Sequence, residues 1–184
     1  MNFNIPTILT LLRIASIPLI LIVFYLPIDN ARVWCSAIFI IASATDWLDG
    51  FLARRLNLQT EFGEFLDPVA DKLMVVMILV LIVQADPVAY LAIPASIIIG
   101  REVYVASLRE WMAQLGQRST IEVSWLGKCK TGFQMVAMLC LLFNTDIYDL
   151  PVRMLGLVLI YIACLLSLWS MWQYIQLAIP KFKK

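Results

Sequence analysis

The sequence predicts an all-α integral membrane protein, a bundle of six transmembrane helices that follows a short interfacial N-terminal segment. First, 62% of the 184 residues are hydrophobic and only 15% are charged, against about 25% charged residues in soluble domains. Second, the apolar residues gather in six stretches, each close to the roughly 20 residues that cross a bilayer. Third, the chain contains no internal repeat, low-complexity tract or soluble linker. We therefore expect residues 1–184 to form a single membrane domain.

Each apolar stretch predicts one helix. The six stretches are 8–26, 32–54, 68–84, 88–111, 121–143 and 152–178. The mixed polarity of Asn2–Thr7, before the first stretch, is typical of a segment in the membrane interface, and Pro6 suits an early helix position.

The connections between the stretches predict their pairing. Three breaks are short, at Pro27–Asn30, Asp86–Pro87 and Asn144–Pro151, and each should join two antiparallel helices. The longer connections, 55–67 and 112–120, should lie on the opposite side, together with both termini.

The basic residues predict the orientation. Of the 14 Lys and Arg residues, all except Arg32 and Arg153 fall on or toward the side of the longer connections and the termini. Basic residues concentrate on the cytoplasmic side of membrane proteins. Both termini should therefore be cytoplasmic.

The composition also excludes several kinds of site. Histidine is absent, so acid–base chemistry near neutral pH falls mainly to carboxylates. The net charge of +1 gives no general attraction to nucleic acid. The four cysteines show no C-x-x-C spacing, which favours apolar packing over a zinc site. These are Cys35, Cys129, Cys140 and Cys164.

Two pairs of aspartates lie where lipid is expected. Asp46 and Asp49 precede Arg54 by eight and five residues, which places them roughly 12 and 8 Å inside the cytoplasmic end of a helix. Asp67 and Asp71, four residues apart, form a second pair at the start of the third helix. Carboxylates at this depth need a metal ion, a basic partner or a hydrated cavity. Two such pairs provide a set of hard oxygen donors.

This donor set predicts a metal-dependent site for a nucleotide diphosphate. Oxygen ligands without histidine or thiolate favour Mg²⁺, Ca²⁺ or Mn²⁺, and four carboxylates carry enough charge for two ions. Gly50 and Ala53 leave room for a flat ligand, and Arg54 can bind phosphate oxygens.

Purely structural interpretations exist for single residues. Asp67 could cap a helix that starts with Pro68, and Asp71 could pair with Lys72 or another cation. The small residues of the second helix could serve close helix packing. All of these positions fall within the 26 residues from Asp46 to Asp71. A purely structural interpretation needs a separate reason for each position, whereas a metal site gives one reason for all of them.

The segment from Asp46 to Asp71 resembles the CDP-alcohol phosphotransferase family. It matches the family pattern D-x2-D-G-x2-A-R-x8-G-x3-D-x3-D at all eight fixed positions, and the likeness extends to Asn4–Thr7, Leu108–Trp111 and Val123–Lys128. The resemblance implies six membrane helices, a homodimer, and a polar cavity that opens to the cytoplasm from the bacterial inner membrane.

The resemblance also implies roles for individual residues. Four aspartates would hold two divalent cations, Mg²⁺ or Mn²⁺: Asp46, Asp49, Asp67 and Asp71. Asp71 would also be the catalytic base. The CDP group would be bound by Asp49, Gly50, Ala53, Arg54 and Gly63. The implied reaction moves the phosphatidyl group of CDP-diacylglycerol to sn-glycerol 3-phosphate and releases CMP.

A phosphorylated acceptor requires cations beyond those of the signature. Four basic residues near cytoplasmic helix ends are candidates for binding the acceptor phosphate: Arg101, Arg109, Lys128 and Lys130. Lys128 and Lys130 point about 200° apart on a regular helix, so the two arginines form the safer pair. Glu102 could simply pair with a neighbouring cation, and basic residues at helix ends can also bind lipid headgroups.

Two alternatives remain open at this stage. The same chemistry with inositol phosphate or serine as acceptor would also fit the signature. A divalent-cation transporter would use the aspartates as a transit site, but it would give no joint role to Gly50, Ala53 and Arg54.

Overall fold

The computed structural model describes residues 5–56, 61–114, 125–146 and 150–179, and within these ranges the side chains at 5, 6, 46–56, 61, 64, 125–129, 177 and 178 are not described. The chain divides into two compact units. Unit 1 comprises residues 1–81 and 142–145, and unit 2 comprises residues 82–141 and 146–184.

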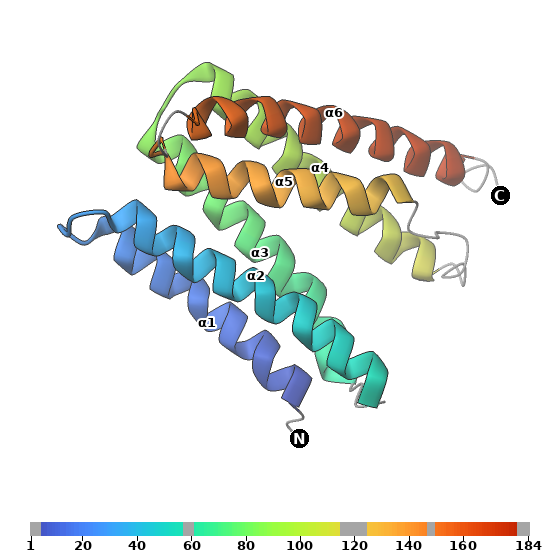
Figure 1. Cartoon of the computed structure of the whole chain (residues 1–184). Helices are drawn as coiled ribbons and strands as arrows, with labels where there is room; N and C mark the ends of the chain where they lie inside the picture. Colours follow the sequence, from blue (N-terminus) through green and yellow to red (C-terminus); the bar gives the residue numbers. More distant parts are fainter. Residues whose placement is uncertain (1–4, 57–60, 115–124, 147–149, 180–184) are drawn as a thin grey trace. The chain divides into compact units, whose positions relative to one another are not determined.

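The described residues contain six helices, labelled in Figure 1, which confirms the all-α prediction. They are α1 (Ile5–Tyr25), α2 (Ala31–Leu56), α3 (Glu61–Ala85), α4 (Ala89–Gln114), α5 (Trp125–Phe143) and α6 (Val152–Ala178). Pro6 lies in the first turn of α1, as expected. The interfacial position of the N-terminal segment stays a prediction, because residues 1–4 lie outside the described ranges.

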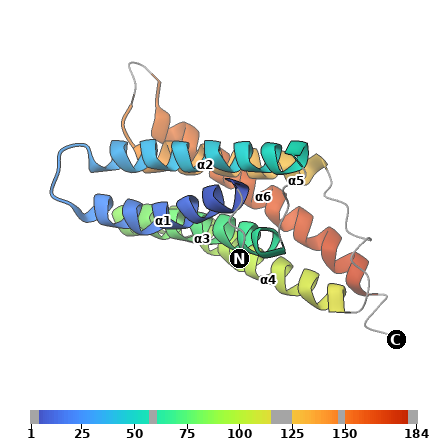
Figure 2. The same ribbon diagram turned by 90° about the horizontal axis from the view of Figure 1, so that it is seen from below.

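In unit 1, α1 and α2 form an antiparallel pair joined by a tight turn, as Figures 1 and 2 show. Asn30 has a φ of 59°, a left-handed conformation that asparagine tolerates better than most residues. Its carbonyl accepts hydrogen bonds from the amides of Val33 and Trp34, which starts α2. Ile20 and Phe39 are almost completely buried in this unit.

The start of α3 differs from the prediction. The helix begins at Glu61 rather than at residue 68, so the expected connection over 55–67 reduces to residues 57–60. Pro68 therefore lies inside the helix, and Asp67 is not an N-cap. Proline removes one backbone donor from a helix interior, but the donors on either side can still form the helix. A proline after a charged segment is therefore not a sufficient signal for a helix start in this chain.

In unit 2, α4 and α6 pack against each other and run in the same direction. Three contacts set this direction, since residues further along α4 meet residues further along α6: Tyr90 with Tyr161, Arg101 with Ser170, and Arg109 with Tyr174.

The helices α5 and α6 approach closely at Gly156. A Cβ atom at this position would lie 2.9 Å from Cγ of Leu141 and 3.0 Å from Cβ of Cys140. Small residues allow such close approach between helices in membrane proteins. Gly156 is therefore required by packing.

The two basic residues predicted on the non-cytoplasmic side both bind at helix connections. In unit 1, Arg32 donates from Nε to the carbonyl of Leu142 over 3.1 Å, near the end of α5. In unit 2, Arg153 pairs with Asp86 and donates to the hydroxyl of Tyr90 over 2.9 Å. Arg32 thus ties the start of α2 to the end of α5, and Arg153 ties the start of α6 to the connection between α3 and α4.

Three helices are long and apolar enough to cross a membrane within the part of the chain that the structure describes: Thr7–Tyr25, Ala89–Gln114 and Val152–Gln176. Ala31–Thr45 and Lys130–Phe143 form shorter apolar helices. Large apolar side chains stay exposed on these helices, such as Leu12, Leu19 and Leu165, as expected for surfaces that face lipid. Cys35 and Cys164 are buried, in agreement with a packing role.

Candidate functional site

A polar face runs along the first half of α1. Thr7, Thr10 and Arg13 follow one another at a spacing of three residues, and each is at most 3% exposed. Residues three apart lie on neighbouring positions of a helix surface. Most of the other residues of α1 are apolar, so a buried charge on this face needs polar partners from the rest of unit 1.

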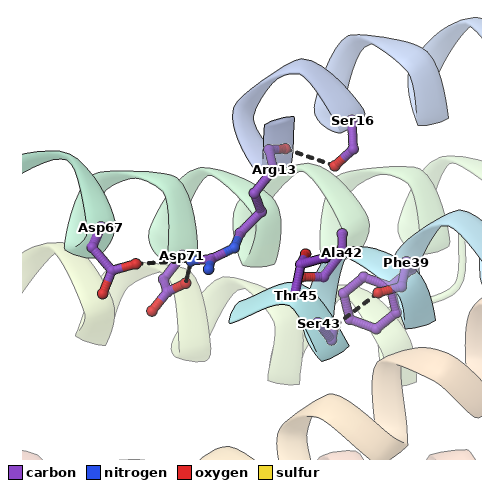
Figure 3. Close-up of polar contacts among 8 residues, drawn as sticks. All are labelled: Arg13, Ser16, Phe39, Ala42, Ser43, Thr45, Asp67 and Asp71. Atoms are coloured by element: carbon purple, nitrogen blue, oxygen red, sulfur yellow. Dashed lines mark hydrogen bonds and ion pairs between the residues drawn. The ribbon is translucent and has the colours of Figure 1, made fainter. Parts of the chain in front are cut away.

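Arg13 finds such partners on α3. Its Nη1 atom lies 3.0 Å from Oδ1 of Asp67 and 2.8 Å from Oδ1 of Asp71, so one guanidinium nitrogen bridges both carboxylates. Figure 3 shows the two aspartates one helical turn apart on α3, with the Arg13 side chain reaching them from α1. The sequence left open whether Asp71 pairs with Lys72 or with another cation. The structure confirms pairing with another cation, Arg13.

The three side chains of this cluster differ in how far they are exposed. The Arg13 side chain is 2% exposed, whereas those of Asp67 and Asp71 are 43% and 45% exposed. The guanidinium therefore holds the carboxylates from the buried side, while their outer parts can reach a soluble ligand.

Asp67 and Asp71 each direct one carboxylate oxygen at the same point, the Nη1 atom of Arg13. Their Oδ1 atoms already converge on a single positive atom, and carboxylate oxygens are the ligands that Mg²⁺ and Mn²⁺ prefer. Among the described residues no group of three or more acidic or cysteine side chains could hold a metal ion. The structure thus brings together two of the four aspartates predicted as metal ligands.

The other predicted residues of this site lie outside the described side chains. The α2 backbone is helical at all five of these positions, which are Asp46, Asp49, Gly50, Ala53 and Arg54. Because their side chains are not described, their roles stay predictions. Just before them, the hydroxyls of Ser43 and Thr45 donate to carbonyls one turn back in their own helix (Figure 3). Gly63 lies in the first turn of α3, one turn before Asp67.

Unit 2 contains a second cluster of charges. Oε1 of Glu102 lies 2.6 Å from Nη1 of Arg101 and 2.6 Å from Nζ of Lys130. The Arg101 and Lys130 side chains are 9% and 3% exposed. Glu102 therefore pairs with neighbouring cations, as predicted, and the three side chains carry a net charge of +1. The structure brings Arg101 and Lys130 together on one carboxylate.

The two predicted arginines of α4 are each held by a hydroxyl of α6. Nη2 of Arg101 lies 3.1 Å from Oγ of Ser170, and Nη2 of Arg109 donates to the hydroxyl of Tyr174. The Arg109 guanidinium also lies 5.0 Å from the centre of the Tyr174 ring, within cation–π range. The Lys128 side chain is outside the described residues, so its role stays a prediction.

Sequence reasoning missed three residues of these clusters. In the sequence Arg13 contributes only to the predicted membrane orientation, although its spacing from Thr7 and Thr10 is a usable signal of a polar helix face. Ser170 and Tyr174 were not singled out, because hydroxyl side chains occur throughout the apolar stretches. Their spacing of four residues on α6 places both on one face.

Comparison with known proteins shows which family the chain belongs to. A family model described as CDP-alcohol phosphatidyltransferase matches residues 3–169. The chain belongs to the CDP-alcohol phosphatidyltransferase family. This match spans most of units 1 and 2, and it includes the aspartate signature and the charge cluster on α4 and α5.

Relatives within the family are similar to the chain over nearly its whole length. A protein of Haemophilus influenzae is 51% identical over 178 residues, which cover 97% of this chain and 95% of the relative. Proteins of Salmonella choleraesuis and Pectobacterium atrosepticum are 49% and 48% identical over 97% of the chain and 96% of each relative. All three are named CDP-diacylglycerol–glycerol-3-phosphate 3-phosphatidyltransferase.

Proposed function

We propose that this protein transfers the phosphatidyl group of CDP-diacylglycerol to sn-glycerol 3-phosphate, giving phosphatidylglycerophosphate and CMP. The observation that carries the proposal is the 51% identity to a transferase of this name over 97% of the chain. The intact signature from Asp46 to Asp71 supports the same chemistry.

In the proposed reaction, the C1 hydroxyl oxygen of glycerol 3-phosphate attacks the β-phosphorus of CDP-diacylglycerol. The new oxygen–phosphorus bond forms as the bond to the CMP oxygen breaks, and Asp71 accepts the hydroxyl proton. Asp71 suits this role because its carboxylate is held in place by Arg13 while its side chain is still 45% exposed. Its outer part can therefore meet a soluble alcohol.

The signature aspartates are proposed to hold two divalent cations, Mg²⁺ or Mn²⁺. When bound, these cations would offset the charge of the diphosphate and orient the attacking and leaving oxygens. Asp67 and Asp71 support this assignment, since both direct Oδ1 at one cationic atom. Asp46 and Asp49 are assigned as the other ligands, and Gly50, Ala53, Arg54 and Gly63 as the CDP site, from the match to the family signature.

The acceptor phosphate is assigned to the basic residues Arg101, Arg109, Lys128 and Lys130. Arg101 supports this role most directly. It is only 8% exposed, and its Nε atom has no hydrogen-bond partner within the part of the chain that the structure describes. A buried donor of this kind can be satisfied by a phosphate oxygen.

We further propose one membrane domain over residues 1–184, with all six helices in the bacterial inner membrane and with both termini and the active site facing the cytoplasm. The distribution of basic residues supports this orientation. A homodimer is proposed from the resemblance to the family.

The direct test uses purified protein in detergent micelles with CDP-diacylglycerol and Mg²⁺. Adding sn-glycerol 3-phosphate should release CMP and yield a lipid that carries a second phosphate. Serine and inositol phosphate are offered in parallel. Faster turnover with either of them would refute the proposed acceptor. If none of the three acceptors caused CMP release, the proposed reaction itself would be refuted.

A further inference from the structure

The helix α6 contributes two hydroxyl groups that the family signature does not include. Ser170 and Tyr174 lie one helical turn apart, and each contacts one arginine of α4. Those arginines, Arg101 and Arg109, are eight residues apart, or about two turns. In unit 2, α4 and α6 pack against each other, which is the arrangement that makes both contacts possible.

We infer that Ser170 and Tyr174 are positioning residues, which orient Arg101 and Arg109 for a phosphate monoester. This inference rests on the proposed function only for the identity of that ligand as glycerol 3-phosphate. The contacts themselves are independent of it.

Ser170 acts on a guanidinium that is already partly fixed. Nη1 of Arg101 is directed to Glu102, 2.6 Å away, and Nη2 to Ser170, 3.1 Å away. Two contacts on different nitrogens define the plane of the guanidinium. The direction of its Nε–H, which has no partner among the described residues, is then also defined. An oriented, buried donor binds an anion without first losing rotational freedom.

Tyr174 acts on a more exposed guanidinium by two contacts at once. Its hydroxyl accepts from Nη2 of Arg109, and the guanidinium carbon lies 5.0 Å from the ring centre. The ring itself packs against a buried cluster of Leu108 and Met112 on α4. Tyr174 is therefore held in place by apolar contacts and can restrict the long Arg109 side chain.

The test measures steady-state kinetics of Ser170→Ala and Tyr174→Phe in detergent micelles. Each should raise the KM for sn-glycerol 3-phosphate about threefold to tenfold, as expected for losing one hydrogen bond that orients a charged group. The kcat and the KM for CDP-diacylglycerol should stay within about twofold, because the signature residues are unchanged. Ser170→Thr, which keeps a hydroxyl, should restore the KM.

The same helix offers matched controls. Ser167 is fully buried one turn before Ser170, and its hydroxyl has no partner among the described residues. Tyr161 donates its hydroxyl to the carbonyl of Tyr90 over 2.9 Å, away from both arginines. Ser167→Ala and Tyr161→Phe should leave all three parameters unchanged. An equal rise of the KM in these controls, or no rise in Ser170→Ala and Tyr174→Phe, would overturn the inference. If Ser170→Ala does not fold, Tyr174→Phe decides, because its contact is exposed.

A second readout separates this inference from the proposed function. Inorganic phosphate should raise the melting temperature of the wild-type protein, and should raise it less in Ser170→Ala and Tyr174→Phe. This result would support the inference even if glycerol 3-phosphate proved not to be a substrate. No stabilisation of the wild type by phosphate would overturn it.

Discussion

The bridge from Arg13 to Asp67 and Asp71 predicts an unequal response to mutation. Removing the arginine leaves two carboxylates whose side chains are 43% and 45% exposed, so water can solvate them again. Removing both carboxylates leaves a guanidinium that is 2% exposed. The second change should therefore cost more stability than the first.

The magnitudes follow from the burial of each partner. Two charged hydrogen bonds contribute about 1.5–3 kcal/mol each when buried, and exposed ion pairs only about 0.2–1 kcal/mol. Because the carboxylates are half-exposed, Arg13→Met should lower the free energy of unfolding by about 1–3 kcal/mol in total. The double variant Asp67→Ala/Asp71→Ala should lower the free energy of unfolding by more, up to about 3–5 kcal/mol, the range for breaking a buried ion pair by removing one side of it.

The assay is unfolding of the purified protein in detergent micelles, with EDTA present so that no divalent cation contributes. A triple variant that combines all three substitutions completes the cycle. Because it removes the buried charge together with its partners, it should be more stable than the double variant, and the effects should not add.

Two results would refute this reasoning. In the first, Arg13→Met destabilises the protein as much as the double variant does. In the second, the triple variant loses the sum of the separate effects, which would mean that the arginine and the two aspartates stabilise the fold independently.

Three further predictions concern the catalytic base, the cations and the packing of unit 2. Asp71→Asn should abolish CMP release while the melting temperature shows a folded protein; retained turnover would exclude Asp71 as the base. Removing divalent cations with EDTA should stop the reaction, and Mg²⁺ or Mn²⁺ should restore it, whereas full activity in EDTA would contradict the proposed metal site. Gly156→Ala should destabilise the protein by about 1–3 kcal/mol, because a Cβ would lie 2.9 Å from Leu141. Gly132→Ala, with nothing within 4 Å of the added Cβ, should be neutral or slightly stabilising, and an equal loss in both variants would argue against close packing at Gly156.

The six helices were predictable because apolar length is a strong signal in membrane proteins. The short connections were predictable as well, and two of them contain an asparagine, a residue that tolerates a left-handed backbone conformation. Asn144, directly after α5, has a φ of 49°. The start of α3 was not predictable in the same way, since the charged residues before Pro68 resemble a loop. Their helical conformation is consistent with the contacts that Asp67 and Asp71 make with Arg13.

The part of the candidate site that was predictable consists of residues at a characteristic spacing along the sequence. Residues that reach the site from a distant part of the chain were not predictable. Asp67 and Asp71 were found because they lie one turn apart. Arg13 precedes Asp67 by 54 residues, and no local pattern connects them. The same holds for Ser170, which contacts Arg101 from 69 residues away.

The distance along the chain between Arg13 and its carboxylates also bears on how the protein is made. The aspartates follow the arginine by 54 and 58 residues, so at about 5–20 residues per second the ribosome synthesises Asp67 roughly 3–11 s after Arg13. During that interval α1 carries a cation within its apolar span Thr7–Tyr25, which opposes its release into lipid as a single span. Insertion of α1 is therefore expected to be completed only when the third helix emerges, so that the first three helices leave the translocon as a group.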